Sequence, residues 1–266
     1  MEPFLLHTDK DDASLLQLKS WCNNADGITA GFTTRQTGNV ALHVGDNPSV
    51  VLLNRKRVTE LLDWSFETWT CAEQVHGKQV YVAKRNDTGR GRNDRESAFQ
   101  NTDAIITNEP DLLLVMFFAD CVPLYFYDPV TNAIGLAHAG WKGTVANIVA
   151  ETIEQMSSHF GAKPENINAA IGPSIGSCCY EVDEAVLKHV RPFGVDKDVI
   201  SHTTDGRAHL DLKQLNRHFM IKAGILPRHI EITSLCTSCR TDLLFSHRME
   251  KGDTGRMMSW LGRKSR

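Results

Sequence analysis

Three residues that commonly bind metals lie at the ends of predicted strands. They are His76 in the segment QVHG, Cys121 in ADCVP and His138 in AHAGW. Zinc prefers four tetrahedral nitrogen and sulfur ligands, and catalytic zinc sites keep one position open for water or substrate. Three protein ligands of these types leave that position open. The residue types of His76, Cys121 and His138 therefore suit a catalytic zinc ion.

The separation of these residues along the chain matches no general zinc-binding pattern. Taken singly, a cysteine in an apolar segment is often a small buried hydrophobe, and a histidine is often a hydrogen-bonded core residue. From the residue types alone, this structural interpretation is favoured over the metal site.

Four further cysteines form two pairs in the sequence. Cys236 and Cys239 have the spacing of half a structural zinc site, but the second pair would have to be the adjacent Cys178 and Cys179. Adjacent cysteines are poorly suited to bind one metal. We therefore predict four buried thiols without an assigned role, kept reduced because the seven cysteines come with no export signal.

A glycine-rich segment, Gly140–Gly143, precedes a predicted helix and follows His138 directly. Backbone N–H groups at the start of a helix favour anions, so this segment is a candidate phosphate site. An ordinary turn between a strand and a helix would also use glycine. Only the neighbouring His138 favours the functional interpretation.

Apolar, β-branched and aromatic runs predict a series of short strands, and apolar residues at helical spacing predict four helices. The predicted strands are 28–35, 80–82, 103–107, 112–119, 123–127, 133–139, 168–171, 230–233, 243–246 and 257–261. The predicted helices are 48–64 with Asn47 as its cap, 144–160, one that begins at Asp183, and 211–223. The charged segment 85–96 is predicted to be a solvated loop.

Length and composition favour one α/β domain. The chain has 266 residues, of which 41% are hydrophobic and 23% charged, which is enough apolar surface for one large core. No repeat or linker divides it. We therefore expect a single catalytic domain over 1–266, with 1–27 as an N-terminal extension, in the form of a mixed β-sheet sandwich flanked by helices.

The charge distribution argues against nucleic acids and membranes as partners. The net charge is −3 and the basic residues are scattered, whereas nucleic-acid binders concentrate them. No apolar run reaches the length that spans a bilayer, and acids stand where a signal peptide needs bases. We expect a cytoplasmic enzyme with a small-molecule substrate, either a monomer or a homodimer.

Several short motifs occur together in a characteristic order. They are QVHG at 74–77, DAIIT at 103–107, ADCVP at 119–123, HAGWKG at 138–143, IGPSI at 171–175, YEV at 180–182 and TGR at 254–256. Together they resemble the YfiH-like family, also named laccase-domain or multicopper polyphenol oxidoreductase proteins and now regarded as purine nucleoside phosphorylases. The resemblance covers the chain from about Ile28 to the C-terminus.

The resemblance implies an activity and a set of site residues. It implies that His76, Cys121 and His138 bind zinc, and that the enzyme cleaves adenosine, inosine and methylthioadenosine with phosphate and also deaminates adenosine. The implied fold is shared with the catalytic domain of cytotoxic necrotising factor. Arg35 and Arg248 match family positions and are candidate substrate ligands. Lys142 is a third, although arginine is commoner there and offers a bidentate contact that lysine lacks.

Two other chemistries compete with this interpretation. In a metal-free cysteine hydrolase, Cys121 would attack an amide, such as one in a peptidoglycan precursor, with His138 or His76 as the base. A copper oxidase would need clustered histidines, usually in His-X-His pairs, and no two of the 11 histidines are separated by a single residue. Copper chemistry is therefore the weakest of the three.

Overall fold

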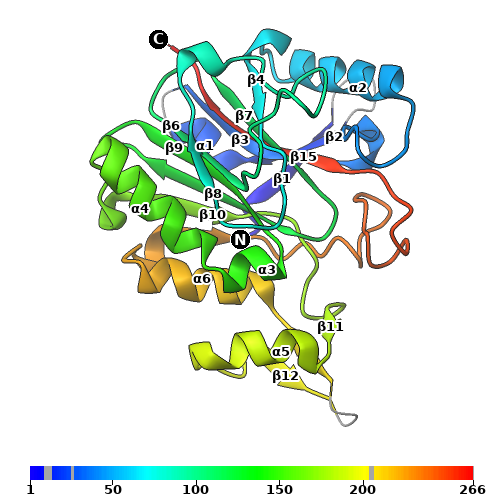
Figure 1. The fold of residues 1–266 in the computed structure, drawn as a ribbon, viewed down its shortest axis with the longest axis vertical. Helices are drawn as coiled ribbons and strands as arrows, with labels where there is room; N and C mark the ends of the chain where they lie inside the picture. The colour runs from blue at the N-terminus through cyan, green and yellow to red at the C-terminus, as the bar shows by residue number, and fades with distance from the viewer. Residues whose placement is uncertain (9–13, 25–26, 204–206, 266) are drawn as a thin grey trace.

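The computed structural model describes residues 1–8, 14–24, 27–203 and 207–265. Two six-stranded sheets pack face to face, and a three-stranded sheet lies at one end (Figure 1). The strands are β1 Phe4–Thr8, β2 Ser14–Leu18, β3 Ile28–Thr33, β4 Trp69–Cys71, β5 Val80–Val82, β6 Ala104–Thr107, β7 Leu113–Phe118, β8 Val122–Asp128, β9 Ala133–Ala139, β10 Asn168–Ile171, β11 Glu181–Val182, β12 Ile200–His202, β13 Ala208–Leu210, β14 Ile230–Ile232 and β15 Met257–Arg263. The helices are α1 Lys19–Asn24, α2 Pro48–Leu61, α3 Trp141–Val145, α4 Ile148–Phe160, α5 Glu184–Val190 and α6 Leu212–Lys222.

Both large sheets are mixed. The first has the order β1-β2-β3-β15-β7-β4 and is antiparallel except between β7 and β4. The second has the order β14-β10-β8-β9-β6-β5, with parallel pairs at its two edges. The expected mixed sandwich flanked by helices is confirmed. Residues 4–8 and 14–18, expected to be part of an extension, form two strands of the first sheet.

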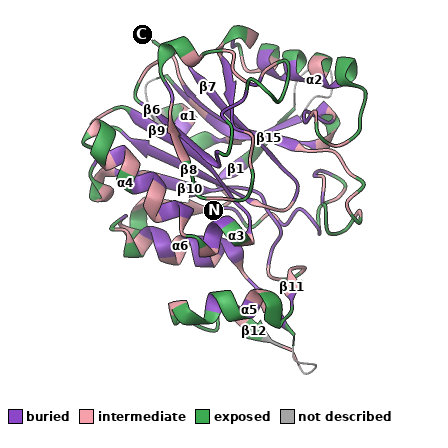
Figure 2. Cartoon of the chain, viewed as in Figure 1, coloured by how far each residue is buried: buried purple, intermediate pink, exposed green. Residues whose placement is uncertain are grey.

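Three apolar layers hold the sandwich together. One lies between the two sheets, where Phe32 and Phe118 of the first sheet meet Tyr125 of the second. Another lies between the second sheet and α4 and α6, and the third packs α2 against the first sheet. Figure 2 shows the strands buried and the helices exposed on their outer faces. Because apolar layers lie on both faces of the sheets, most strands are buried on both sides, which explains their continuous apolar runs in the sequence.

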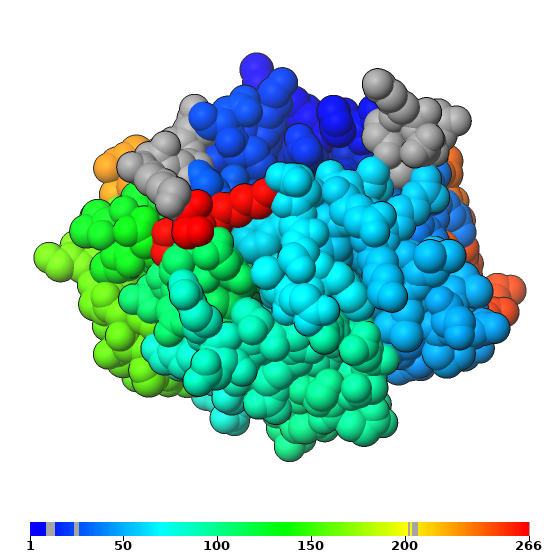
Figure 3. All heavy atoms as spheres, turned by 90° about the horizontal axis from the view of Figure 1, so that it is seen from above, coloured from blue at the N-terminus to red at the C-terminus, as the bar shows by residue number. Residues whose placement is uncertain are grey.

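The chain crosses from the first sheet to the second at several points. It does so between β4 and β5 and again between β7 and β8, and it returns between β6 and β7 and between β14 and β15. The last strand, β15, pairs with β3 on one side and β7 on the other. In the view from above, the C-terminal residues lie between segments from the first third of the chain and from residues near 110 (Figure 3).

Most predicted elements are confirmed, with ends shifted by a few residues. Strand β9 has the predicted bounds, and α2 begins at Pro48 with the Asn47 side chain accepting the Ser49 N–H at 2.9 Å. The helices beginning at Asp183 and Asp211 are also present, each capped by that aspartate. Strands β1, β2, β4 and β11–β13 and helix α1 were not predicted.

Two predicted elements are wrong. The helix predicted over 144–160 is two helices, because Asn147 adopts a left-handed conformation (φ 61°) between α3 and α4. The strand predicted over 243–246 is a turn, in which the N–H groups of Leu243 and Leu244 both donate to the Arg240 carbonyl. These leucines are apolar because they pack into the layer between the sheets, not because they join one.

A buried arginine fastens the charged loop 85–96 to α2. Arg55 is 2% exposed and donates to the carbonyls of Val40, Gly91 and Arg92 at 2.7–2.9 Å. Its guanidinium also lies 4.8 Å from the Phe117 ring centroid. The loop is mostly solvent-exposed, as predicted, but one buried cation ties its backbone to the domain.

Replacement of Arg55 by methionine should destabilise the protein. Three carbonyls, two of them buried, would lose their donors, at a cost of about 3 kcal/mol or more. For a chain of this size that corresponds to a melting temperature lower by roughly 6–12 °C. Calorimetry measures the shift, and Lys56→Met, at an exposed position of the same helix, is the matched control. Equal melting temperatures for the two variants would contradict this account.

Candidate metal centre

The structure brings His76, Cys121 and His138 together. Their ligand atoms all lie within 4.8 Å of one another, and the Cys121 sulfur is 3.8 Å from His76 Nε2. The two imidazole rings are 4.8 Å apart and nearly perpendicular. Such an arrangement allows all three atoms to point at one ion. The predicted convergence of these residues is therefore present, and the group can hold a metal.

The fold explains the convergence. His76 lies where the chain crosses between the sheets from β4 to β5, and Cys121 lies where it crosses from β7 to β8. His138 is the penultimate residue of β9, which pairs with β8. Two crossings and a strand end thus meet at one edge of the sandwich.

The carboxylate of Asp103 connects two of the three ligands. It is fully buried, accepts the backbone N–H groups of Val75, His76 and Gly77 at 2.7–3.2 Å, and lies 2.9 Å from His138 Nδ1. With Nδ1 bound to Asp103, His138 turns Nε2 toward the Cys121 sulfur. A carboxylate that orients a histidine in this way is typical of metal sites.

The sequence interpretation did not single out Asp103 as a site residue. It opens the motif DAIIT, and its signal was a charged residue at the start of a fully apolar strand, where burial is costly unless the charge is satisfied. Burial by itself raises the pKa of Asp103, but the hydrogen bond with His138 and the backbone N–H groups lower it overall.

The backbone around the site is strained. Gln74, His76 and Asp120 all have positive φ, between 63° and 86°, which is uncommon for residues with side chains. Hydrogen bonds of the Gln74 side chain with the backbone of Phe117 (2.8 Å each) hold the first turn, and the Asp120 carboxylate holds the second by accepting from Thr237 and from the Arg248 N–H (2.6 Å each). Strain of this kind is concentrated at functional sites.

Gly140 is required at its position because of close approach. A Cβ there would lie 2.9 Å from His76 Cδ2 and 3.0 Å from the Cys121 sulfur. Any side chain would therefore displace two of the three ligands. The glycine that suggested a phosphate-binding turn has this second, steric reason to be present, and α3 after it is only five residues long.

Two cavities open on the metal-binding group from different sides. The first, here called the Trp141 cavity, has a volume of about 270 Å³ and is lined by His76, Asp120, Cys121, Gly140, Trp141, Lys142, Ile175, Tyr180 and Leu212. The second, here called the Arg256 cavity, has about 250 Å³ and is lined by His43, Gln74, His76, Phe117, Phe118, Ala119, Cys121, His138, His247 and Arg256. His76 and Cys121 belong to both linings, so a metal held there would face both spaces.

The three predicted substrate ligands differ in their placement. Lys142 lines the Trp141 cavity. Arg35 and Arg248 are not among the described residues that line either cavity. Arg248 donates to the Glu181 carbonyl at 3.0 Å and lies over the Tyr180 ring, at the margin of the Trp141 cavity. Arg256, which the sequence interpretation did not propose as a ligand, lines the other cavity directly.

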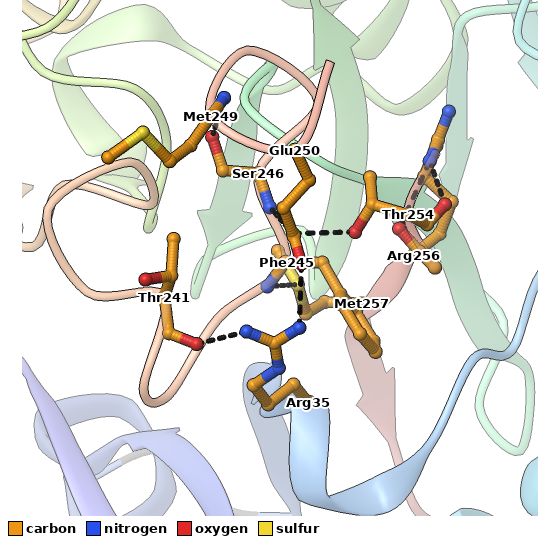
Figure 4. Close-up of polar contacts among 10 residues, drawn as sticks. Arg35, Thr241, Phe245, Ser246, Met249, Glu250, Thr254, Arg256 and Met257 are labelled. Atoms are coloured by element: carbon orange, nitrogen blue, oxygen red, sulfur yellow. Dashed lines mark hydrogen bonds and ion pairs between the residues drawn. The ribbon is translucent and has the colours of Figure 1, made fainter. Parts of the chain in front are cut away.

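Arg35 belongs to a network that holds the segment before β15. Its guanidinium pairs with Glu250 at 2.8 Å, donates to the Thr241 carbonyl and lies over the Phe245 ring (Figure 4). Glu250 in turn accepts from the Ser246 N–H and the Thr254 hydroxyl. These contacts give Arg35 a structural role in shaping the segment that leads to Arg256.

Comparison with known proteins shows the family of this chain and agrees with its fold. The profile of the family described as multi-copper polyphenol oxidoreductase laccase matches residues 25–264. A relative from Bacillus subtilis named purine nucleoside phosphorylase YlmD is 39% identical over 98% of both chains, and one of the same name from Geobacillus stearothermophilus is 40% identical over 90% of this chain and 91% of the relative.

Solved structures give the same result. The structure of YlmD from Geobacillus stearothermophilus superposes with a TM-score of 0.92 at 36% identity, covering all of both chains. That of the Bacillus licheniformis hypothetical protein YfiH also gives 0.92, at 39% identity, over 99% of this chain and all of the other. Fold and metal-binding group define a sandwich protein with a His₂Cys site. The chain belongs to the laccase-like YfiH family.

In the described residues, no helix has the length and apolar character needed to cross a membrane.

Replacement of Asp103 by asparagine should weaken metal binding. The amide cannot accept from three N–H groups and His138 as a carboxylate does, so both histidines lose their fixed orientation. We expect affinity for Zn²⁺ added to the metal-free protein to fall about 10–100-fold. Competition with a chromogenic chelator measures this. Asp183→Asn, which replaces one good helix cap by another, should leave affinity unchanged; equal affinities in all three proteins would contradict the role of Asp103.

The thiol of Cys121 should react as a thiolate in the metal-free protein. Burial alone raises its pKa, but His138 and His76 lower it to about 6. Burial alone lowers the pKa of His138, but Cys121 and Asp103 raise it to about 9. Because the pKa of Cys121 is lowered, its alkylation rate should rise through pH 6 and level off by pH 7. Peptide mapping after timed iodoacetamide treatment measures this, with Cys22, whose pKa burial raises, as internal control.

Proposed function

We propose that this protein is a zinc-dependent purine nucleoside phosphorylase that also deaminates adenosine. Adenosine, inosine and methylthioadenosine are the proposed substrates, with phosphate as the second reactant. The observation that carries the proposal is the His76–Cys121–His138 group facing two cavities at once. One cavity for the nucleoside and one for phosphate meet at a single point, as a two-substrate transfer requires.

The donor set favours zinc over copper. Two imidazoles and a thiolate also occur in blue-copper sites, which add a long axial contact, most often from methionine. Neither cavity lining contains a methionine among the described residues. Three ligands, an oriented histidine and open space beside them instead fit a catalytic zinc site. When bound, zinc would supply Lewis acidity that polarises an oxygen of the substrate or of water.

The Trp141 cavity suits the nucleoside. Trp141 and Tyr180 offer aromatic faces to a purine, and Ile175 and Leu212 add apolar contact. Burial and the nearby Cys121 raise the pKa of Tyr180 to about 12, so its hydroxyl stays protonated and can donate to an acceptor on the base or ribose.

The Arg256 cavity suits phosphate. Arg256 supplies a permanent positive charge. Its backbone N–H donates to the Asn39 side-chain oxygen at 2.9 Å, which fixes its position. Burial and the neighbouring Arg256 lower the pKa of His43 to about 4, so at neutral pH it offers hydrogen bonds without charge. Phosphate held here would be bound and oriented by one guanidinium and two imidazoles, those of His43 and His247.

The proposed reaction is balanced without an external reagent. An oxygen of phosphate forms a bond to C1′ of the ribose, and the bond from C1′ to the purine nitrogen breaks. The purine leaves with the bonding electrons and takes up the proton that phosphate gives up. Lys142, in the nucleoside cavity, would stabilise charge that develops on the substrate during this exchange.

A cysteine hydrolase is the second candidate, supported by one observation. Asp103, His138 and Cys121 form a chain of contacts like that of a nucleophile, its base and an orienting acid. The measurement that separates the two candidates is metal dependence. A hydrolase of this type would keep its activity after chelation and lose it on alkylation of Cys121.

Activity toward nucleosides should require the metal-binding group. The purified protein with adenosine or inosine and phosphate should release free base and ribose 1-phosphate, and with adenosine alone should release ammonia. His76→Ala should contain one equivalent of zinc less than the wild type and lose both activities. His159→Ala, on α4 outside both cavities, is the matched control. Full zinc content with no turnover of any of these nucleosides would overturn the proposal.

Arg256→Met should weaken phosphate binding selectively. Loss of a hydrogen-bonding cation costs about 1.5–3 kcal/mol, equivalent to roughly a 10–150-fold rise in KM for phosphate. KM for the nucleoside should change little, because it occupies the other cavity. Steady-state kinetics with each substrate varied measures this, with the exposed Arg228→Met as control. If Lys142→Met raises the phosphate KM and Arg256→Met does not, the assignment of the two cavities is reversed.

A further inference from the structure

Four cysteines that the sequence interpretation left without a role form a second cluster. The sulfur atoms of Cys178, Cys179, Cys236 and Cys239 all lie within 4.8 Å of one another. The adjacent Cys178 and Cys179 lie in one turn, so that both thiols reach Cys239, at 3.5 and 3.4 Å. The expectation that all four thiols are buried is wrong, because Cys178 and Cys239 are exposed.

Two of the sulfur–sulfur distances fit a metal site better than a disulfide. Four sulfurs at about 2.3 Å from a tetrahedral zinc ion are about 3.8 Å apart, whereas a disulfide brings two sulfurs to about 2.05 Å. The observed distances of 3.4 and 3.5 Å are close to the tetrahedral value. We propose that Cys178, Cys179, Cys236 and Cys239 bind a second zinc ion, with a structural role.

Backbone N–H groups donate to one sulfur of the cluster, that of Cys236. The Gly176 N–H donates to the Cys236 sulfur at 3.2 Å, and the Cys239 N–H makes a further hydrogen bond to the same atom. The buried ammonium of Lys213 interacts favourably with Cys236 and Cys178 while it donates to the carbonyls of Thr233 and Leu235. Four thiolates and one Zn²⁺ leave a net charge of −2, which this ammonium and these N–H groups offset.

Four protein ligands complete the coordination of zinc, so no position remains for substrate. The cluster instead joins two segments distant in sequence, one between β10 and β11 and one between β14 and β15. Without metal, the backbone link between them is short: a bridge between Ser174 and Cys236, and the Thr237 N–H bound to the Ser174 carbonyl. A metal would add four bonds to this link.

The joined segments form one wall of the Trp141 cavity. Ile175 and Tyr180, on either side of the adjacent cysteines, line it. Thr237, between the other two cysteines, donates to the carboxylate of Asp120, next to Cys121. The second zinc would therefore fix both the wall of the cavity and the strained turn that presents the Cys121 thiolate.

Metal content tests this proposal independently of any catalytic activity. The protein purified under reducing conditions should contain two equivalents of zinc. Cys239→Ser should lose one, His76→Ala should lose the other, and Cys22→Ser, which removes a thiol outside both groups, should keep two. One equivalent in the wild type that disappears in His76→Ala would overturn the proposal.

A second measurement remains decisive if Cys239→Ser does not fold. In the Co²⁺-substituted wild-type protein, sulfur-to-cobalt charge-transfer absorption should be several times stronger than one thiolate at the first site gives, and His76→Ala should retain most of it. In the zinc-loaded wild type, a thiol reagent should modify Cys178 and Cys239 only after chelation. Immediate modification of both, or a disulfide that joins Cys239 to Cys178 or Cys179, would refute a metal site here.

Discussion

The buried carboxylate of Asp103 is the contact on which the geometry of the site depends. Burial of a charge is costly unless its hydrogen bonds are satisfied, and here three consecutive N–H groups and one imidazole satisfy them. The same four bonds fix the loop that carries His76 and the ring of His138. The hydrogen bonds that make the burial of Asp103 possible therefore also align two ligands from different elements.

The architecture explains why the site lies where it does. A β-sandwich satisfies backbone hydrogen bonds within each sheet, so irregular backbone is concentrated where the chain passes from one sheet to the other. His76, Cys121 and Arg256 all lie in such passages. The apolar layer between the sheets keeps these passages in register, because Phe118 and Tyr125, close to either end of the passage with Cys121, are both buried in it. Packing of the core and placement of the ligands are therefore linked.

The sequence predicted the elements with clear periodicity and the ligands with distinctive chemistry. Strand β9 and helix α2 are short-range features, set by apolar pattern and by the Asn47 cap. The turn at Leu243 could not be predicted in this way, because its apolar residues are buried by contacts with distant strands. The break at Asn147 was missed because apolar spacing continues across it.

The sequence likewise predicted the residue types of the site better than their positions in space. Ligand types identified His76, Cys121 and His138, but convergence itself depends on which strands pair, and only the resemblance to a family supported it. The pairing of Cys178 and Cys179 with a CxxC segment some 60 residues away depends on one backbone bridge at Ser174. No local pattern contains that information, so chain spacing favoured isolated thiols.

Strain at Asp120 explains how the turn that carries Cys121 and the segments that carry the four-cysteine cluster depend on each other. A residue with a side chain and positive φ, such as Asp120, costs of order 1–3 kcal/mol, and persists only where its surroundings hold it. For Asp120 those surroundings are the Thr237 hydroxyl, the Arg248 N–H and the Ile175 N–H. Two of these three donors belong to the segments that the cluster of four cysteines joins. The conformation that presents Cys121 is thus maintained from outside the His76–Cys121–His138 group, largely by the two segments that carry the other four cysteines.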